Sequence, residues 1–141
     1  MTVQSVMTTN PACCTPSTPL REVAKLMLDN DCGQIPVIDD VSSHRPVGVI
    51  TDRDITVRMV AQGQNPLDSV AGECMSSPCI TVTSDTSLRE CCEVMETNKI
   101  RRVPVVDSHG RICGIVSLAD VARCADATET VEVVKEVSTA N

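Results

Sequence analysis

The chain has 141 residues, a formal charge of -7 and no Phe, Tyr or Trp. This length suits one compact domain or two small fused ones and excludes a large multidomain enzyme. Because single-strand nucleic-acid platforms stack bases on aromatic side chains, that class is excluded as well. The acidic balance, 19 Asp and Glu against 12 Lys and Arg, repels DNA, RNA and anionic lipid. We therefore expect no nucleic-acid partner and no membrane partner.

The N-terminal segment predicts a cytoplasmic protein. Met1–Met7 carries no basic cluster and no apolar stretch of signal-peptide length. No segment approaches the ~20 apolar residues that cross a bilayer. Nine cysteines occur without a Cys-x-x-Cys pair or a His at zinc spacing, which disfavours a structural metal site.

An internal repeat organises the chain. The second copy follows the first at an offset of 68 residues, and the offset shortens by two residues towards the end of the copies. The matching segments are Leu20–Glu22 with Leu88–Glu90, Ile35–Asp39 with Val103–Asp107, Gly48–Thr51 with Gly114–Ser117, and Asp54 with Asp120. We expect one repeat in residues 1–66, a second in residues 67–125, and a tail in residues 126–141 that can form a helix.

In chain order, each copy predicts a short strand, a helix, two strands and a second helix. The first helix of copy one begins near Thr18 and Pro19. Its apolar residues recur with helical spacing, which predicts one buried face. They are Leu20, Val23, Ala24, Met27 and Leu28.

The matching helix of copy two follows Ser87-x-x-Glu90, the spacing of a capping box. Its predicted buried face contains Leu88, Cys91, Cys92 and Met95. The paired cysteines therefore have a structural explanation as small core residues.

Two β-rich runs in each copy predict adjacent strands. In copy one they are Ile35–Ile38 and Val47–Thr51, separated by the polar loop Asp39–Arg45. Copy two shortens this loop to Ser108–Gly110. The second helices are expected at about residues 52–62 and at Leu118–Cys124.

The segment Thr51–Asp54 has the residue types of a ribose and phosphate site. A carboxylate can accept hydrogen bonds from both ribose hydroxyls, while the Thr hydroxyl and the charge of Arg53 favour an anion. The same spacing also fits an ordinary capping box. The residues alone leave both interpretations open.

The ordered motifs resemble a tandem CBS-domain pair, also called a Bateman module. The motif set is Val-Met-Thr or Cys-Met-Ser, a helix, hydrophobic-Pro-Val, and Gly-hydrophobic-hydrophobic-Thr/Ser-x-x-Asp, and it occurs twice within about Val6–Cys124. The layout is similar to that of small stand-alone bacterial CBS-pair proteins, including the hypoxic-response type. The resemblance implies an α/β fold in which two pseudo-symmetric β-α-β-β-α repeats pack through their sheets.

The resemblance also implies a function. Clefts between the repeats would bind an adenosyl ligand (AMP, ADP, ATP, NAD or S-adenosylmethionine) in a regulatory, energy-sensing role. No chemical step and no cofactor are required, and the adenine nucleotide acts as a regulatory ligand. A homodimer with exposed helices at its interface, and an effector protein that receives the signal, are the implied partners.

Copy two carries the fuller set of matching residues. In adenine-nucleotide-binding relatives the position of Arg102 contacts phosphate, those of Ser117 and Asp120 hold phosphate and ribose, and those of Ile100 and Ile115 line the base. Alternation along the strand places Arg101 and Arg102 on opposite faces. A solvated strand edge, paired with acids such as Glu96, is the alternative reading of the two arginines.

Copy one departs from the pattern, since Gln34 stands where copy two has Arg102, so we expect two sites that are not equivalent. Thr8 and Ser76 match family positions near the base, although turn hydroxyls explain them equally well. The complete set of predicted ligand-binding residues is Arg102, Ser117, Asp120, Ile100, Ile115, Ala119, Thr51, Asp54, Arg53, Val49, Gln34, Thr8 and Ser76.

A catalytic interpretation finds no support. His44 and His109 lie in the polar loops without a nucleophile in a recognisable elbow, and Asp39 and Asp40 are expected to be turn residues. The alternative function is a ligand-free structural or interaction protein whose cysteines respond to oxidation. Candidates are Cys13, Cys14, Cys74 and Cys79, although a cysteine in an apolar stripe is usually inert.

Overall fold

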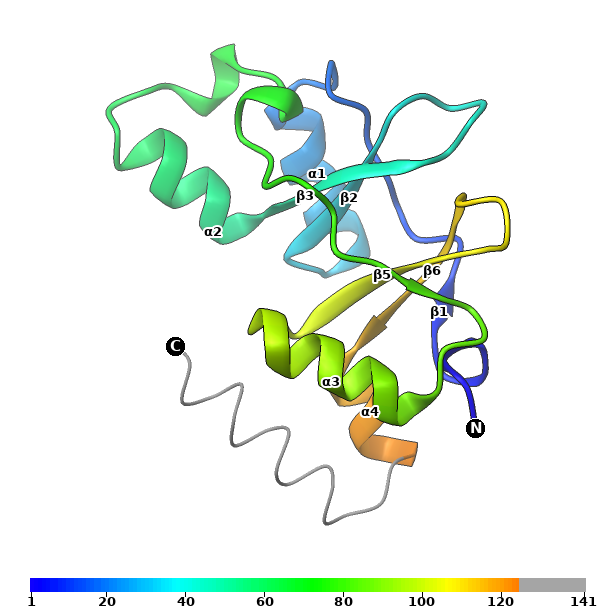
Figure 1. The fold of residues 1–141 in the computed structure, drawn as a ribbon. Helices are drawn as coiled ribbons and strands as arrows, with labels where there is room; N and C mark the ends of the chain where they lie inside the picture. Colours follow the sequence, from blue (N-terminus) through cyan, green and yellow to red (C-terminus); the bar gives the residue numbers. More distant parts are fainter. Residues whose placement is uncertain (125–141) are drawn as a thin grey trace. The chain divides into compact units, whose positions relative to one another are not determined.

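The computed structural model describes residues 1–124 and shows a mixed α/β chain with two compact units (Figure 1). Among the described residues, unit 1 contains residues 1–10 and 80–124, and unit 2 contains Pro11–Cys79. The α/β class and the duplicated elements are confirmed. The tail predicted in residues 126–141 lies outside the described residues, and the repeat bounds at residues 66 and 67 stay a prediction.

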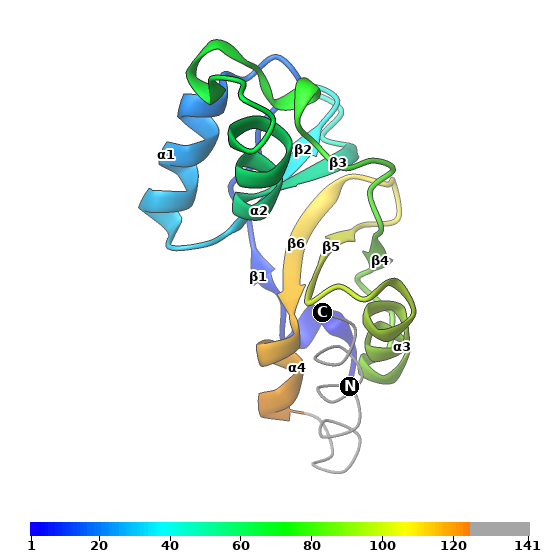
Figure 2. The same cartoon turned by 90° about the vertical axis from the view of Figure 1, so that its left-hand side faces the viewer.

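Unit 2 contains one helix, a strand pair and a second, irregular helix. The elements are α1 (Leu20–Asn30), β2 (Gln34–Ile38), β3 (Pro46–Thr51) and α2 (Asp52–Ile55), which continues as a π-helix over Thr56–Val60. Strands β2 and β3 are antiparallel, and Figure 2 shows α1 and α2 beside them. Short 3₁₀ helices follow at Pro66–Asp68 and Ala71–Glu73.

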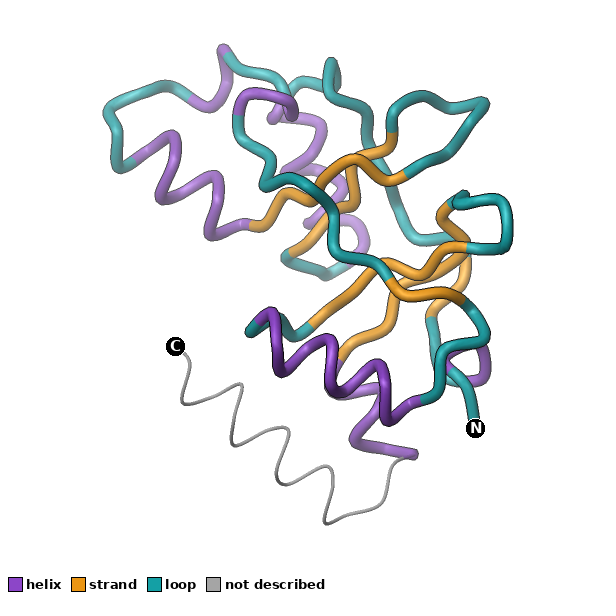
Figure 3. The backbone as a smooth tube through the Cα atoms, viewed as in Figure 1, coloured by secondary structure: helices purple, strands orange, loops and turns teal. Residues whose placement is uncertain are grey.

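Unit 1 has the same plan with a fuller sheet. Its strand order is β1 (Thr8–Thr9), β6 (Ile112–Ser117), β5 (Arg102–Val106) and β4 (Val82–Thr83). A 3₁₀ turn at Val3–Ser5 precedes β1, and the helices are α3 (Leu88–Asn98) and α4 (Leu118–Cys124). Figure 3 shows that the β2–β3 loop is longer than the β5–β6 loop, as the sequence predicted.

The edge pairings repeat between the units. In unit 1, Thr8 pairs antiparallel with Ile115, and β4 runs parallel to β5. In unit 2, Ser76 pairs antiparallel with Val49, while Cys14 pairs in parallel with Val37. Each strand hairpin therefore has a partner segment on both of its edges.

The leading segment of each copy packs in the unit that holds the other copy's helices. We call residues 1–10 and 70–79 the leading arms. The first arm reaches β6 through Thr8, and the second reaches β3 through Ser76. A Cβ on Gly48 would lie 2.7 Å from the Ser76 carbonyl oxygen, and a Cβ on Gly114 would lie 2.9 Å from that of Thr8. Glycine at both positions is what allows the arms to approach the strands.

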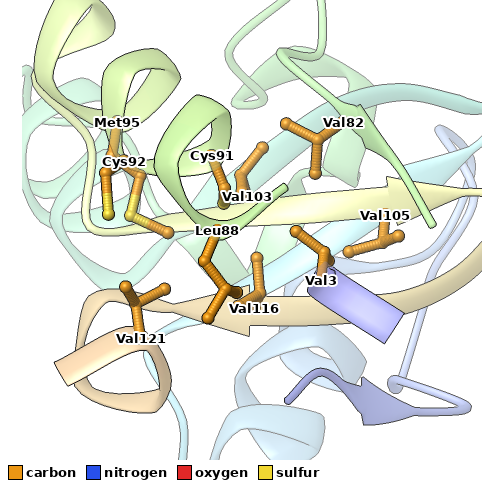
Figure 4. Close-up of a cluster of buried hydrophobic side chains, with 10 residues drawn as sticks. All are labelled: Val3, Val82, Leu88, Cys91, Cys92, Met95, Val103, Val105, Val116 and Val121. Atoms are coloured by element: carbon orange, nitrogen blue, oxygen red, sulfur yellow. The ribbon is translucent and has the colours of Figure 1, made fainter. Parts of the chain in front are cut away.

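The core of unit 1 contains only aliphatic and sulfur-containing side chains. In Figure 4 the side chains of α3 face those of the central strands, which confirms the buried face predicted for this helix. The Ser87 hydroxyl caps α3 by accepting a 3.1 Å hydrogen bond from the Glu90 amide. The cluster consists of Val3, Val82, Leu88, Cys91, Cys92, Met95, Val103, Val105, Val116 and Val121.

The buried face predicted for α1 is partly wrong. Leu20 and Val23 are buried, but Ala24 is exposed and Leu28 is 79% exposed, while Leu26 and Met27 pack against the core. The position of Leu28 corresponds to Glu96 of α3, which is also exposed. In the last turn of both α1 and α3, this position therefore faces solvent.

Two further features complete unit 2. The helix α1 begins after Pro19, whereas the Thr18 hydroxyl accepts a hydrogen bond from the Thr15 amide instead of capping the helix. The buried core of unit 2 consists of Cys14, Leu20, Val23, Ile35, Val37, Ile50, Met59, Ala71 and Cys74.

Across the described residues of both units, no helix has the length and apolarity that a bilayer crossing requires.

Candidate functional site

The start of α2 is a capping box that uses Asp54. The Thr51 hydroxyl accepts a hydrogen bond from the Asp54 amide at 3.0 Å, and Asp54 Oδ2 accepts one from the Thr51 amide at 3.0 Å. The capping interpretation of Thr51–Asp54 is therefore correct as a description of local structure. It leaves Asp54 Oδ1 directed to other groups, because a carboxylate offers about four acceptor positions.

Two further groups reach Asp54. The Ser76 hydroxyl of the leading arm lies 3.3 Å from Oδ1 and 3.4 Å from Oδ2. Arg58 Nε lies 3.7 Å from Oδ1, and Arg58 also donates a 3.2 Å hydrogen bond to the Met75 carbonyl oxygen. The structure thus brings two predicted residues, Asp54 and Ser76, together from different copies.

The start of α4 repeats the capping box in unit 1. The Ser117 amide donates to Asp120 Oδ2 at 2.9 Å, and the Asp120 amide donates to the Ser117 hydroxyl at 3.1 Å. Asp120 Oδ1 forms an ion pair with Arg123. The side chain of Asp120 is 15% exposed, as is that of Asp54. Thr8 pairs with Ile115 of the adjacent strand β6. Within residues 1–124, however, no hydrogen bond joins Thr8 to Asp120, in contrast to Ser76 and Asp54 in unit 2.

A strand residue stands opposite each capping hydroxyl. Gln34 is the partner of Thr51 in the β2–β3 register, and Arg102 is the partner of Ser117 in the β5–β6 register. Because directly opposed residues project from the same face of a sheet, each pair shares a face. The exposed Arg102 side chain is therefore adjacent to the start of α4.

The predicted residues fall into two groups, one in each unit. We call them junction 1, where β6 meets α4, and junction 2, where β3 meets α2. Ile100 packs against the unit 1 core, Ile115 and Val49 are half-buried, and Ala119 and Arg53 are exposed. Their role in ligand binding stays a prediction. Junction 1 holds Thr8, Ile100, Arg102, Ile115, Ser117, Ala119 and Asp120, and junction 2 holds Gln34, Val49, Thr51, Arg53, Asp54 and Ser76.

Sequence reasoning missed Arg58 and Arg123, the two arginines that contact the junction aspartates. Each follows its aspartate by four or three residues, the spacing at which opposite charges meet on one helix face. That spacing was the available signal. The contact of Ser76 with Asp54 had no such signal, because 22 residues separate them.

The polar loops hold turn residues. Asp39 accepts hydrogen bonds from the Ser43 hydroxyl and from the Asp40 and Arg45 amides, and these bonds, that of Ser43 foremost, lower the pKa of its carboxyl group. His109 is exposed and His44 is half-buried. In the described part of the chain, no group of three or more His, Cys, Asp or Glu residues could hold a metal ion.

Burial makes four of the cysteines weak nucleophiles. It raises the thiol pKa of Cys14 and Cys91 to about 12, and that of Cys13 and Cys79 to about 11. The thiolate is the reactive form of cysteine. These thiols are therefore protonated near neutral pH, which disfavours the oxidation-responsive alternative for them.

The chain is similar in sequence to known proteins. The family model described as CBS domain matches residues 3–61 and 70–127. Hypoxic response protein 1 of Mycobacterium tuberculosis is 34% identical over 136 residues, which cover 96% of this chain and 93% of that protein. The uncharacterized protein MK0525 of Methanopyrus kandleri is 36% identical over 100 residues, which cover 71% of this chain and 50% of that protein. The chain thus spans about half the length of this second relative.

Three solved structures share the fold. Hypoxic Response Protein I with two coordinated zinc ions aligns with a TM-score of 0.79 at 35% identity, over 89% of this chain and 100% of that chain. CBSX2 in complex with AMP aligns at 0.73 and 27% identity, over 93% and 98%. The CBS domain pair of protein MJ0100, with 5′-methylthioadenosine and S-adenosyl-L-methionine, aligns at 0.76 and 27% identity, over 87% and 94%.

Proposed function

We propose that this chain, which belongs to the CBS-domain family as a tandem pair of the hypoxic-response type, is a non-catalytic regulatory module. It binds an adenosyl ligand at the two junctions and signals by a change of conformation. The observation that carries the proposal is the junction aspartate. In each unit one nearly buried carboxylate is held at a strand end beside a hydroxyl.

The ligands of the relatives share one group. CBSX2 was solved with AMP, and the MJ0100 pair with 5′-methylthioadenosine and S-adenosyl-L-methionine. All three carry a ribose with vicinal hydroxyls, and a single carboxylate can accept a hydrogen bond from each. The capping box fixes the Asp120 carboxylate before the ligand arrives, so little side-chain entropy is lost on binding.

The other residues of junction 1 complement the rest of an adenine nucleotide. Arg102 supplies a planar cation suited to a phosphate. Ile100 and Ile115 are half-buried and offer apolar contact to the base. A ribose at Asp120 competes with Arg123 for Oδ1, so we expect Arg123 to move when the ligand binds.

Binding alone can produce the output. A ligand that favours one conformation of the module shifts the population towards it and changes what a partner protein contacts. No bond is made or broken in the ligand. The proposal includes a homodimer, an effector protein, a cytoplasmic location and an energy-sensing role, as the family resemblance implies.

Calorimetric titration of nucleotide-free protein tests the proposal. AMP, ADP, ATP, NAD, S-adenosylmethionine and 5′-methylthioadenosine are titrated separately, and we expect saturable binding of at least one. Asp120→Ala removes the carboxylate from junction 1 and is expected to weaken binding there at least about tenfold, since hydrogen bonds to charged groups contribute ~1.5–3 kcal/mol. Asp107→Ala, in the β5–β6 loop of the same unit, is the matched control. Absence of heat for all six ligands would overturn the proposal.

A further inference from the structure

The junctions can be compared position by position, because their backbones make the same contacts. The Leu118 amide donates to the Arg101 carbonyl oxygen at 2.7 Å, and the Asp52 amide donates to the Gly33 carbonyl oxygen at 3.0 Å. The next strand residues, Arg102 and Gln34, lie opposite Ser117 and Thr51. The four strand and helix positions around each capping hydroxyl therefore correspond.

The side chains at these positions differ in charge. Junction 1 has Arg101, Arg102, Leu118 and Ala119, so two cations and no anion. Junction 2 has Gly33, Gln34, Asp52 and Arg53, in which one anion balances one cation. The aspartates Asp120 and Asp54 are each paired with an arginine and cancel between the junctions. Junction 1 is thus more positive by two charges.

The cations of junction 1 are available to a ligand. Arg101 and Arg102 are exposed, and neither side chain forms an ion pair or hydrogen bond with another of residues 1–124. By strand alternation Arg101 projects from the opposite face, so the exposed Arg102 guanidinium is the group that favours a dianionic phosphate over a neutral group beside Ser117. Arg102, on the face of Ser117, has the geometry for a direct contact.

Junction 2 places a carboxylate where junction 1 has a leucine. A Cβ on Gly33 would lie 2.8 Å from Asp52 Oδ2 and 3.2 Å from Oδ1. Asp52 therefore occupies the space in which a side chain at position 33 would stand. A phosphate on the face of Thr51 would find an uncharged amide at Gln34, and the exposed Asp52 carboxylate adds a negative charge at the same helix start.

We propose that the junctions select their ligands by charge: junction 1 takes an adenosyl ligand that carries a phosphate, and junction 2 takes one without a phosphate. This inference rests on the proposed function and names the ligand class for each of its two sites. Arg102 and Gln34 are the specificity-determining residues.

Two probes with the same adenosine test the proposal. AMP carries a 5′-phosphate, and 5′-methylthioadenosine carries a methylthio group in its place. Both are titrated calorimetrically against the full chain, and each stoichiometry is recorded per chain. For the wild-type protein we expect one tight AMP site, with 5′-methylthioadenosine still able to bind when AMP is saturating.

A reciprocal exchange of the two residues supplies the decisive comparison. Arg102→Gln is expected to lower the ratio of AMP affinity to 5′-methylthioadenosine affinity at junction 1 by about 10- to 100-fold. Gln34→Arg is expected to raise the number of AMP sites from one to two. Arg111→Gln, at the residue before β6 in the same unit, is the control for loss of one positive charge. Circular dichroism spectra verify that each variant is folded, and Gln34→Arg tests the proposal independently if Arg102→Gln fails to fold.

The outcomes separate this inference from the proposed function. If neither probe binds nucleotide-free wild-type protein, both are overturned. If AMP binds two equivalent sites, or if Arg102→Gln weakens both probes equally and Gln34→Arg adds no AMP site, only the charge selection is overturned. A loss of AMP affinity in Arg111→Gln as large as that in Arg102→Gln would also contradict it, because the effect would then be one of net charge.

Discussion

The two junctions have the same capping box but hold their aspartates differently. Asp54 contacts Arg58 and also Ser76 of the leading arm, so side chains tie the arm to junction 2. Asp120 contacts Arg123 of its own helix, and the arm at junction 1 is attached through the backbone pairing of Thr8 with Ile115. The duplicated backbone therefore places the two carboxylates in equivalent positions, while the side chains that differ between the copies determine the chemistry around them.

The largest difference expected on substitution lies in the cores. Ile35 of unit 2 and Val103 of unit 1 occupy matching positions and are 1% and 0% exposed. Ile35→Ala should destabilise the protein by about 2–5 kcal/mol, and Val103→Ala by less, because it removes one methylene fewer, worth ~0.8 kcal/mol. Urea unfolding followed by circular dichroism measures both. Val41→Ala, at a position that is 77% exposed, is the control, and equal losses in all three variants would refute the assignment of the core.

The attachment of the leading arms can be tested at the matching glycines. Gly48→Ala would place a methyl group 2.7 Å from the Ser76 carbonyl oxygen, and Gly114→Ala would place one 2.6 Å from the Met7 sulfur and 2.9 Å from the Thr8 carbonyl oxygen. Each should cost about 1–3 kcal/mol by overpacking. We expect the Gly48 variant to be the worse of the two, since its nearest neighbour is rigid backbone. Thermal unfolding measures the order, and unchanged stability in both would show that the arms do not pack as described.

The capping boxes offer a smaller and sharper comparison. Ser117→Ala and Thr51→Ala each leave one helix-terminal amide without its hydroxyl acceptor, which typically costs ~1 kcal/mol. Thr51→Ala should cost less, because Asp54 keeps a contact with the Ser76 hydroxyl in addition to its arginine, whereas Asp120 keeps the ion pair with Arg123. Both are measured without ligand by urea unfolding. A larger loss for Thr51→Ala would mean that the contacts of Ser76 and Arg58 do not support the junction.

The smallest effect is expected for the ion pairs themselves. Arg58 is 51% exposed and lies 3.7 Å from Asp54, and exposed pairs of this kind contribute about 0.2–1 kcal/mol. Arg58→Ala should therefore shift the unfolding midpoint only slightly, and less at high salt because of screening. A loss of several kcal/mol would contradict this view of the pair as a weak, displaceable contact.

Local features of the fold followed from the sequence. The strand runs, the position of α4 and the Ser87 cap were predicted because hydrophobic period and capping residues act over a few positions. The predicted helix over residues 52–62 is α-helical only at Asp52–Ile55, after which the Ala61 amide bonds to the Thr56 carbonyl oxygen in π geometry. Ile55, Thr56 and Val57 are β-branched and poor helix formers.

The non-local features could not be predicted from the residues. Hydrophobic periodicity does not predict that Thr8 pairs with Ile115 or that the Ser76 hydroxyl contacts Asp54. These contacts depend on which copy each leading arm packs against. The charge difference between the junctions was visible in part, through Gln34 and Arg102. The position of the Asp52 carboxylate was not visible in the sequence, since it depends on the space left by Gly33.

The most direct test of ligand binding at the junctions is an amide NMR titration of nucleotide-free protein with AMP. We expect saturable chemical-shift changes at the amides of Arg102, Ser117 and Asp120, with much smaller changes at Thr51 and Asp54. The resonance of the Asp107 amide in the β5–β6 loop should not shift. Saturable shifts confined to residues outside both junctions, or none at any AMP concentration, would contradict ligand binding at the junctions.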